Sequence, residues 1–109
     1  MKKTIRNMVE GFGPSGFEDR IRKRIRTEIR GCADKVHVDA MGNLIALRRG
    51  TAAKRKTIMV AAHMDEIGLM VSYVDKRGFV RISPLGGVSP IYELGGRVQF
   101  ENGVVGVIH

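Results

Sequence analysis

Residues 57–68 hold the side chains whose types and spacing are best suited to chemistry. They read T-I-M-V-A-A-H-M-D-E-I-G, an apolar run that ends directly on His63, Asp65 and Glu66. An imidazole is the commonest metal ligand in proteins, and a carboxylate often orients such a ring through a hydrogen bond. The pattern is consistent with a metal site built on His63 and Asp65. A His at a strand end is more often an ordinary polar terminus, so the H-x-D spacing alone leaves both interpretations open.

The element that must position these side chains is a strand predicted over residues 57–62. The run is nearly all apolar, which is typical of a central strand covered on both faces. Residues i and i+2 of a strand point to the same side, so we expect His63 and Asp65 to face one cavity. Open α/β sheets place their ligands at this carboxyl end of the strands. Glu66 follows Asp65 directly and should point to the opposite side, so we interpret it as a structural or outward-facing residue.

Helical periodicity is confined to the N-terminal third of the chain. Apolar spacing predicts a short helix over residues 4–11, ended by the segment G-F-G-P-S-G. A second helix is predicted over residues 16–30. Ser15 and Glu18 form a candidate capping box at its start, and Gly31 closes it.

Strand and turn patterns dominate the rest of the chain. The alternation V-H-V-D, the turn A-M-G-N and the run L-I-A-L predict a hairpin over residues 36–47. The sequences D-K-R-G, P-L-G-G-V-S-P and E-N-G then separate further strands. These strands are predicted over residues 67–74, 78–83, 97–101 and 104–108. The loss of helix signals near residue 72 indicates a change of architecture there.

Length and composition limit the class of protein. The 109 residues and 12.1 kDa allow one hydrophobic core. A hydrophobic fraction of 43% with 28% charged residues is typical of a soluble globular protein, and no apolar run approaches the roughly 20 residues of a membrane span. No apolar signal-peptide core develops near the N-terminus, so we expect a cytoplasmic protein with no membrane partner. The single cysteine, Cys32, cannot form an internal disulfide.

The formal net charge of +8 raises the question of an anionic partner. Residues 1–30 hold nine basic and four acidic side chains. Ile21, Ile25 and Ile29 form an apolar stripe on the second predicted helix, which leaves its arginines on solvated faces. With two Tyr, four Phe and no Trp, the chain offers few aromatic platforms for nucleic-acid bases. A non-enzymatic basic interaction or nucleic-acid-binding domain is therefore the alternative function, and a nucleic-acid partner is not favoured.

Five sequence blocks increase the weight given to His63 and Asp65. They are F-G-P-S-G-F-E-D at residues 12–19, V-D-A-M-G-N-L-I-A at 38–46, M-V-A-A-H-M-D-E-I-G at 59–68, and the later G-F-V-R-I-S-P-L-G-G and G-G-R-V-Q-F. Each block is short, but the set follows one order along most of the chain. The chain resembles the N-terminal part of the glutamyl and tetrahedral aminopeptidases, which are dinuclear-metal peptidases. Some members of that family carry cellulase or endoglucanase labels.

The resemblance implies an α/β fold. The family has a mixed sheet in an aminopeptidase-type catalytic domain, interrupted by a β-rich, PDZ-like dimerisation domain. Carried over to this chain, the resemblance assigns residues 1–72 to the N-terminal part of the catalytic domain and residues 73–109 to the first part of the dimerisation domain. It also implies a homo-oligomer in which dimers assemble further.

The resemblance also implies roles for two residues. His63 matches a metal ligand, and Asp65 matches the catalytic-site residue that orients this ligand. In such enzymes two divalent metal ions, usually zinc or cobalt, activate the water that attacks the peptide substrate. The expected function is that of a metalloaminopeptidase, a hydrolase that releases N-terminal residues from peptides.

The chain departs from the family pattern in the ligands that it contains. The other acidic and histidine residues of the family's site lie in a second half that this sequence lacks, and neither His37 nor His109 is an evident replacement. We therefore expect an N-terminal fragment that is inactive by itself. A glycosidase is less favoured. Its two carboxylates must face each other across a sugar, whereas Asp65 and Glu66 are neighbours on opposite strand faces.

Overall fold

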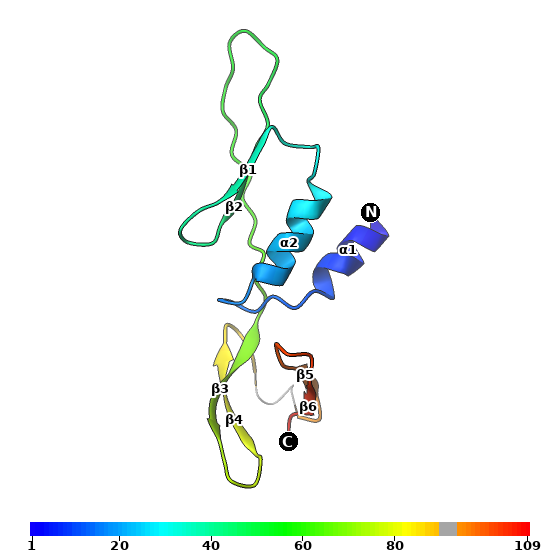
Figure 1. Cartoon of the computed structure of the whole chain (residues 1–109), viewed down its shortest axis with the longest axis vertical. Coiled ribbons are helices and arrows are strands. Elements are labelled where there is room, and N and C mark those ends of the chain that lie inside the picture. Colours follow the sequence, from blue (N-terminus) through cyan, green and yellow to red (C-terminus); the bar gives the residue numbers. More distant parts are fainter. Residues whose placement is uncertain (90–93) are drawn as a thin grey trace. The chain divides into compact units, whose positions relative to one another are not determined.

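The computed structural model describes residues 1–89 and 94–109 (Figure 1). The chain forms two compact units, and each is described by itself. Unit 1 consists of Met1–Gly13 and Phe17–Met64, and unit 2 consists of Pro14–Gly16 and Asp65–His109. The division between the units follows Met64. The predicted domain limit after residue 72 lies within a strand of unit 2, and the assignment of domains by function stays a prediction.

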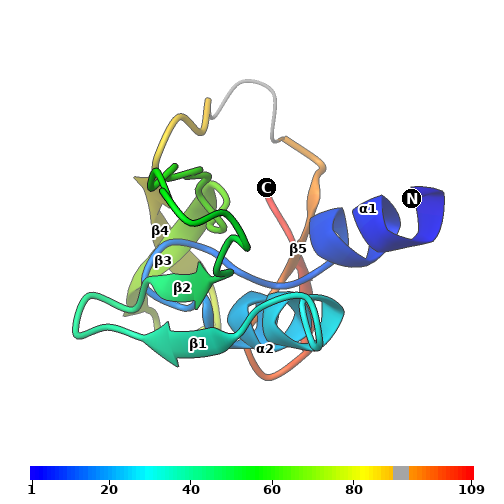
Figure 2. The same cartoon turned by 90° about the horizontal axis from the view of Figure 1, so that it is seen from above.

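Unit 1 contains two helices and one hairpin. Helix α1 covers Lys2–Val9 and helix α2 covers Asp19–Glu28. Strands β1 (Lys35–Val38) and β2 (Leu44–Leu47) pair antiparallel, which confirms the predicted hairpin. Figure 2 shows α2 beside this hairpin. The contact includes a 2.8 Å hydrogen bond from the Arg22 side chain to the carbonyl of Gly42.

The predicted capping box at the second helix is wrong. Helix α2 begins three residues later than predicted, with Glu18 at its N-cap and no hydrogen bond from a capping side chain. The hydroxyl group of Ser15 instead donates to the carboxylate of Asp65. Because Glu18 is the N-cap residue, Ser15 lies three residues before the cap position, and its hydroxyl proton is given to a carboxylate, which is a strong acceptor.

Ile21 of helix α2 packs against the segment that joins the two helices. Among the described residues, it is the only large apolar side chain that is buried, with 4% of its surface exposed. A β-carbon added to Gly13 would lie 2.8 Å from the Cγ2 atom of Ile21, and one added to Gly11 would lie 3.2 Å from its Cδ1 atom. The two glycines of G-F-G therefore let the chain pass close to α2, and Ile21 fills the space.

Residues 57–62 do not form the predicted central strand. They carry no regular secondary structure, and Ile58, Met59 and Val60 are 85%, 87% and 91% exposed. A strand buried on both faces requires hydrogen-bonded neighbours and covering elements. In the part of the chain that the structure describes, the named strands pair only as three two-stranded sheets, and none of them includes this run.

The described residues of unit 2 form two antiparallel hairpins. Strand β3 (Gly68–Val74) pairs with β4 (Val80–Leu85), and β5 (Arg97–Gln99) pairs with β6 (Val105–Val107). These elements confirm the four strands predicted in this region, with ends that coincide or differ by at most two residues. No helix lies in the described residues after residue 74, as the sequence predicts. Residues 90–93, part of the predicted loop between strands, lie outside the described residues.

The three hairpins seen in residues 1–89 and 94–109 close with the same five-residue turn. In each turn the first backbone N–H donates to the carbonyl of the fifth residue, and the fourth N–H donates back to the carbonyl of the first residue. The fourth residue has φ between 85° and 89°, a conformation that glycine adopts without steric cost. The turns cover residues 39–43, 75–79 and 100–104. Their common motif is a glycine in fourth position, which fixes the register of each strand pair.

Candidate functional site

The predicted site residues lie on both sides of the division between the units. His63 belongs to unit 1 and is exposed. Asp65 opens the second segment of unit 2 and is half-buried. Glu66 is exposed and its backbone forms an isolated parallel bridge with Pro14. This bridge is consistent with the interpretation of Glu66 as a structural residue.

Asp65 is held by a residue that sequence reasoning did not place in the site. The Oγ atom of Ser15 donates to Oδ2 of Asp65 over 2.6 Å, in a part-buried contact between residues 50 positions apart in the chain. This length is typical of a hydroxyl group that donates to an ionised carboxylate. The hydrogen bond therefore fixes the orientation of the Asp65 side chain. The signal in the sequence is the turn P-S-G before a helix, but that turn is equally typical of a cap.

The backbone on both sides of this hydrogen bond is also closely packed. Pro14 bridges Glu66, and a β-carbon on Gly68 would lie 2.7 Å from the Cβ atom of Pro14. Gly16 has φ of +87°, so the turn that carries Ser15 requires a residue that adopts the left-handed region without strain. Segments 14–16 and 65–68 thus form one local structure, which we call the Ser15 clasp.

The described residues do not fit a dinuclear metal centre by themselves. Among them, no group of three or more His, Cys, Asp and Glu side chains is placed to hold a metal ion. His37 lies exposed on β1, and His109 is exposed at the last position of the sequence. His63 can supply one imidazole nitrogen to a metal ion. A zinc site usually needs three or four protein ligands, so further ligands must come from other residues if His63 binds metal.

A carboxylate with a shifted pKa lies in the turn of residues 39–43. The Nδ2 group of Asn43 donates to Oδ2 of Asp39 over 2.9 Å, and the backbone N–H groups of Asn43 and Met41 donate to Oδ1 over 2.8 and 3.0 Å. These hydrogen bonds, the Asn43 side chain first, lower the pKa of Asp39 below its ordinary value of 3.8. The hairpin turn is therefore more stable when the Asp39 carboxylate is ionised.

A cleft of about 510 Å³ lies on the two helices of unit 1. Its lining residues are Asn7, Glu10, Lys23, Arg24, Thr27 and Glu28. The lining mixes acidic and basic groups and contains neither an imidazole nor a thiol. This cleft therefore does not contain the imidazole on which the predicted metal site depends.

Comparison with known proteins decides the family. The profile described as M42 glutamyl aminopeptidase matches residues 42–109, a region that includes His63 and Asp65. The chain belongs to this family. The M42 chain is 55% identical over 97 residues to a protein of Acetivibrio thermocellus, a match that covers 89% of this chain and 28% of that protein. It is 40% identical to the lysyl aminopeptidase of Pyrococcus furiosus, with 95% of this chain and 31% of the relative covered.

Solved structures of similar proteins support the same assignment. The TET aminopeptidase of a marine sediment Thaumarchaeota archaeon matches 97% of this M42 chain with a TM-score of 0.86 and 33% identity. A Thermotoga maritima protein described as an endoglucanase matches 87% of the chain with a TM-score of 0.79 and 44% identity. The match covers 30% of each of these two structures. The M42 chain therefore spans less than a third of the length of these relatives.

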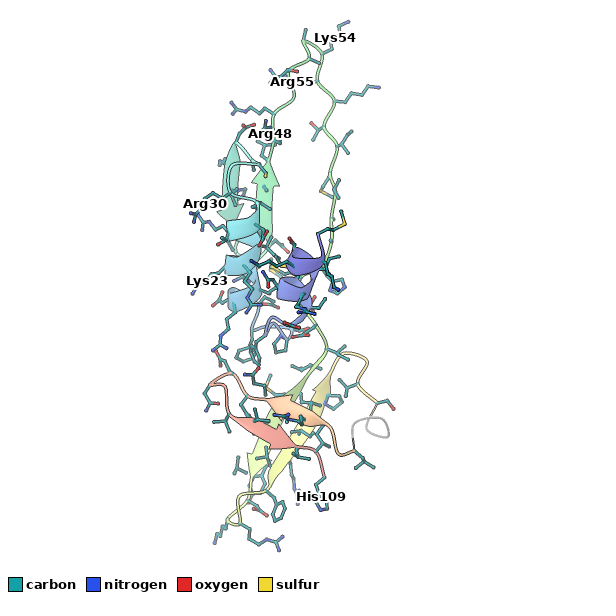
Figure 3. All side chains as sticks on the ribbon, turned by 90° about the vertical axis from the view of Figure 1, so that its right-hand side faces the viewer. Lys23, Arg30, Arg48, Lys54, Arg55 and His109 are labelled. Carbon is teal, nitrogen blue, oxygen red and sulfur yellow. The ribbon has the colours of Figure 1, made fainter. Side chains whose placement is uncertain are left out.

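The positive charge of the M42 chain is concentrated in unit 1. This unit contains 15 Lys and Arg against 6 Asp and Glu, a formal charge of +9, whereas unit 2 contains 4 against 5. Some cations are paired, as where Arg22 contacts the carboxylates of Glu18 and Asp19. Figure 3 shows other side chains that project from unit 1, with Lys54 and Arg55 at the far end of the loop that follows β2.

Proposed function

We propose that this chain supplies the N-terminal part of an aminopeptidase that releases N-terminal residues from peptides. The match of residues 42–109 to the M42 family is the observation that carries this proposal. The matched region contains the sequence H-M-D-E, and the Ser15 clasp holds its Asp65 in a fixed orientation. Relatives named as lysyl and glutamyl aminopeptidases support a peptidase rather than another class of hydrolase.

We propose that His63 is a metal ligand in the complete enzyme and that Asp65 orients its ring. M42 peptidases are generally metal-dependent, and zinc or cobalt are suitable ions for an imidazole ligand. One imidazole cannot hold two divalent cations by itself. We therefore propose that residues outside those described supply further ligands of a two-metal centre. For the same reason we propose that the 109-residue chain alone has no aminopeptidase activity.

We further propose a cytoplasmic homo-oligomer. The described residues contain no helix that is long and apolar enough to cross a membrane. A similar solved structure, at 37% identity and a TM-score of 0.79, is described as a dodecamer in the asymmetric unit. The exposed side chains of Ile58, Met59 and Val60 form an apolar surface of the kind that proteins cover by association. The PDZ-like dimerisation domain assigned to residues 73–109 is part of this proposal.

A chimera tests the proposed activity. This chain would replace the matching N-terminal region of the Pyrococcus furiosus lysyl aminopeptidase, to which it is 40% identical. We expect the chimera to release lysine from a peptide and to lose this activity on treatment with a chelator. A chimera that folds with the circular dichroism of its parent but shows no hydrolysis would reject the proposal. Hydrolysis of carboxymethyl cellulose, tested in parallel, would instead support a glycosidase.

The charge of unit 1 favours a second candidate function, the binding of nucleic acid. Its formal charge of +9 suits a phosphate backbone, and Lys54 and Arg55 are exposed in the loop after β2 (Figure 3). The affinity of the chain for a mixed-sequence RNA can be measured by fluorescence anisotropy at two salt concentrations. Binding that weakens steeply with salt and is reduced in a Lys54→Glu, Arg55→Glu variant would support this function. Lack of binding at low salt would exclude it.

A further inference from the structure

We propose that Ser15 is a positioning residue for Asp65, a role that rests on the proposed aminopeptidase function. The 2.6 Å hydrogen bond joins the P-S-G turn to the sequence H-M-D-E across 50 residues of chain. Both residues are half-buried, which limits competition from water for the same hydrogen bond. The M42 family profile matches residues 42–109 and so does not include Ser15.

The chemistry of the two groups suits this role. An ionised carboxylate accepts about four hydrogen bonds, so the hydroxyl group of Ser15 occupies one acceptor position of Asp65 and leaves the carboxylate able to accept another donor. A hydroxyl group has one proton to give, and the geometry directs it to Oδ2. Ser15 therefore sets the orientation of the side chain without replacing its other partners.

The surrounding backbone keeps the two groups at this distance. Pro14 forms a parallel bridge with Glu66, so the residues next to Ser15 and Asp65 are joined as well. The close approach of Pro14 to Gly68 excludes a side chain between the two segments. Because Pro14 has a fixed φ and Gly16 lies in the left-handed region, the turn presents Ser15 in one conformation. The clasp is thus built from several contacts rather than from one surface hydrogen bond.

The kinetic arm of the test uses the chimera with the lysyl aminopeptidase. Ser15→Ala should lower kcat by about 10- to 100-fold with KM little changed, because a misplaced catalytic-site group slows the reaction without weakening substrate binding. Ser15→Thr keeps the hydroxyl group and should restore most of the loss. In an Asp65→Asn background, Ser15→Ala should add little, since two residues that act as one unit are not additive.

The matched control is Ser72→Ala. Ser72 also lies in unit 2, but its hydroxyl group donates to the carbonyl of Arg81 over 3.2 Å, within the β3–β4 hairpin. This variant should leave kcat unchanged. Equal losses in Ser15→Ala and Ser72→Ala, a loss that Ser15→Thr does not recover, or a loss confined to KM would each overturn the proposal.

A structural arm separates this inference from the proposed function. Amide hydrogen–deuterium exchange in the 109-residue chain should be faster at residues 15–16 and 65–68 in Ser15→Ala than in the unchanged chain or in Ser15→Thr. If the chimera is inactive but this pattern appears, the aminopeptidase function fails while the contact between Ser15 and Asp65 stands. The absence of protection at these residues in the unchanged chain, or identical exchange in Ser15→Ala, would reject the contact itself.

Discussion

Gly68 and Pro14 approach so closely that a β-carbon on Gly68 would lie 2.7 Å from the Cβ atom of Pro14. Side-chain carbon atoms do not pack at that distance, so an alanine at this position must displace the proline ring. Pro14 precedes Ser15, and Gly68 is the first residue of β3. A change at Gly68 therefore acts on the same clasp that holds Asp65.

We expect Gly68→Ala to destabilise the protein by about 1–3 kcal/mol, the usual cost of forcing an extra carbon into a packed contact. The measurement is the midpoint of urea unfolding. Gly87→Ala is the matched control, because a β-carbon at Gly87 meets no atom within 4 Å. Equal stability of the two variants would mean that the contact with Pro14 is not formed.

Ile21 is the side chain whose loss should cost most in unit 1. It is 4% exposed and lies against Gly11 and Gly13. Ile21→Ala should lower the free energy of unfolding by about 2–5 kcal/mol, because it removes buried methyl groups and leaves a cavity. Thermal unfolding followed by circular dichroism measures this loss. Ile58→Ala, at a position 85% exposed, should change the midpoint little; a similar loss in both variants would contradict the packing seen at Ile21.

The titration of Asp39 tests the turn of residues 39–43. Its pKa is lowered mainly by the Asn43 side chain, so the ionised form stabilises the folded turn. This contribution is present above the ordinary pKa of 3.8 and is lost as the pH falls through the lower, folded value. Asn43→Ala should raise the pKa of Asp39 toward 3.8 and reduce the loss of hairpin stability in acid.

Carbon-13 NMR of the Asp39 carboxyl group measures this pKa. The control is Asn102→Ala, since Asn102 accepts a hydrogen bond from the Val104 N–H in a different turn. That variant should leave the titration of Asp39 unchanged. An unchanged Asp39 titration in Asn43→Ala would show that the side-chain hydrogen bond does not cause the shift.

His63 should be needed for metal binding in the complete enzyme. In the chimera, we expect His63→Ala to reduce bound metal and to lower hydrolysis by orders of magnitude. Asp65→Asn should affect metal content less and lower activity by about 10- to 100-fold, as changes to partners of metal ligands commonly do. Bound metal is measured by plasma mass spectrometry, together with the rate of lysine release.

The control for His63 is His37→Ala, which changes an exposed imidazole on β1. It should retain full metal content and activity. Calorimetric titration of the 109-residue chain with zinc or cobalt should show no tight two-metal site, because the described residues contain no group of three donors. Full activity of His63→Ala, or a tight two-metal site in the 109-residue chain, would reject the assignment of His63.

The sequence by itself determined the elements whose hydrogen bonds are local. The turn sequences D-A-M-G-N and D-K-R-G-F place a carboxylate first and a glycine fourth, and all the hydrogen bonds that close these turns lie within five residues. The spacing of Ile21, Ile25 and Ile29 likewise predicts helix α2. These features follow from backbone geometry and side-chain periodicity, so they could be predicted without knowledge of the rest of the fold.

Tertiary structure decided the partners of residues far apart in the chain. Ser15 satisfies the local rule for a helix cap, yet it donates to Asp65, 50 residues away. The apolar residues 57–62 satisfy the rule for a central strand, yet none of the described strands pairs with them. In both cases the sequence shows what a residue can bond to, whereas the choice of partner depends on which segment the fold brings within 3 Å. The orientation of the Asp65 side chain therefore depends on a long-range contact, and the local sequence pattern could not predict it.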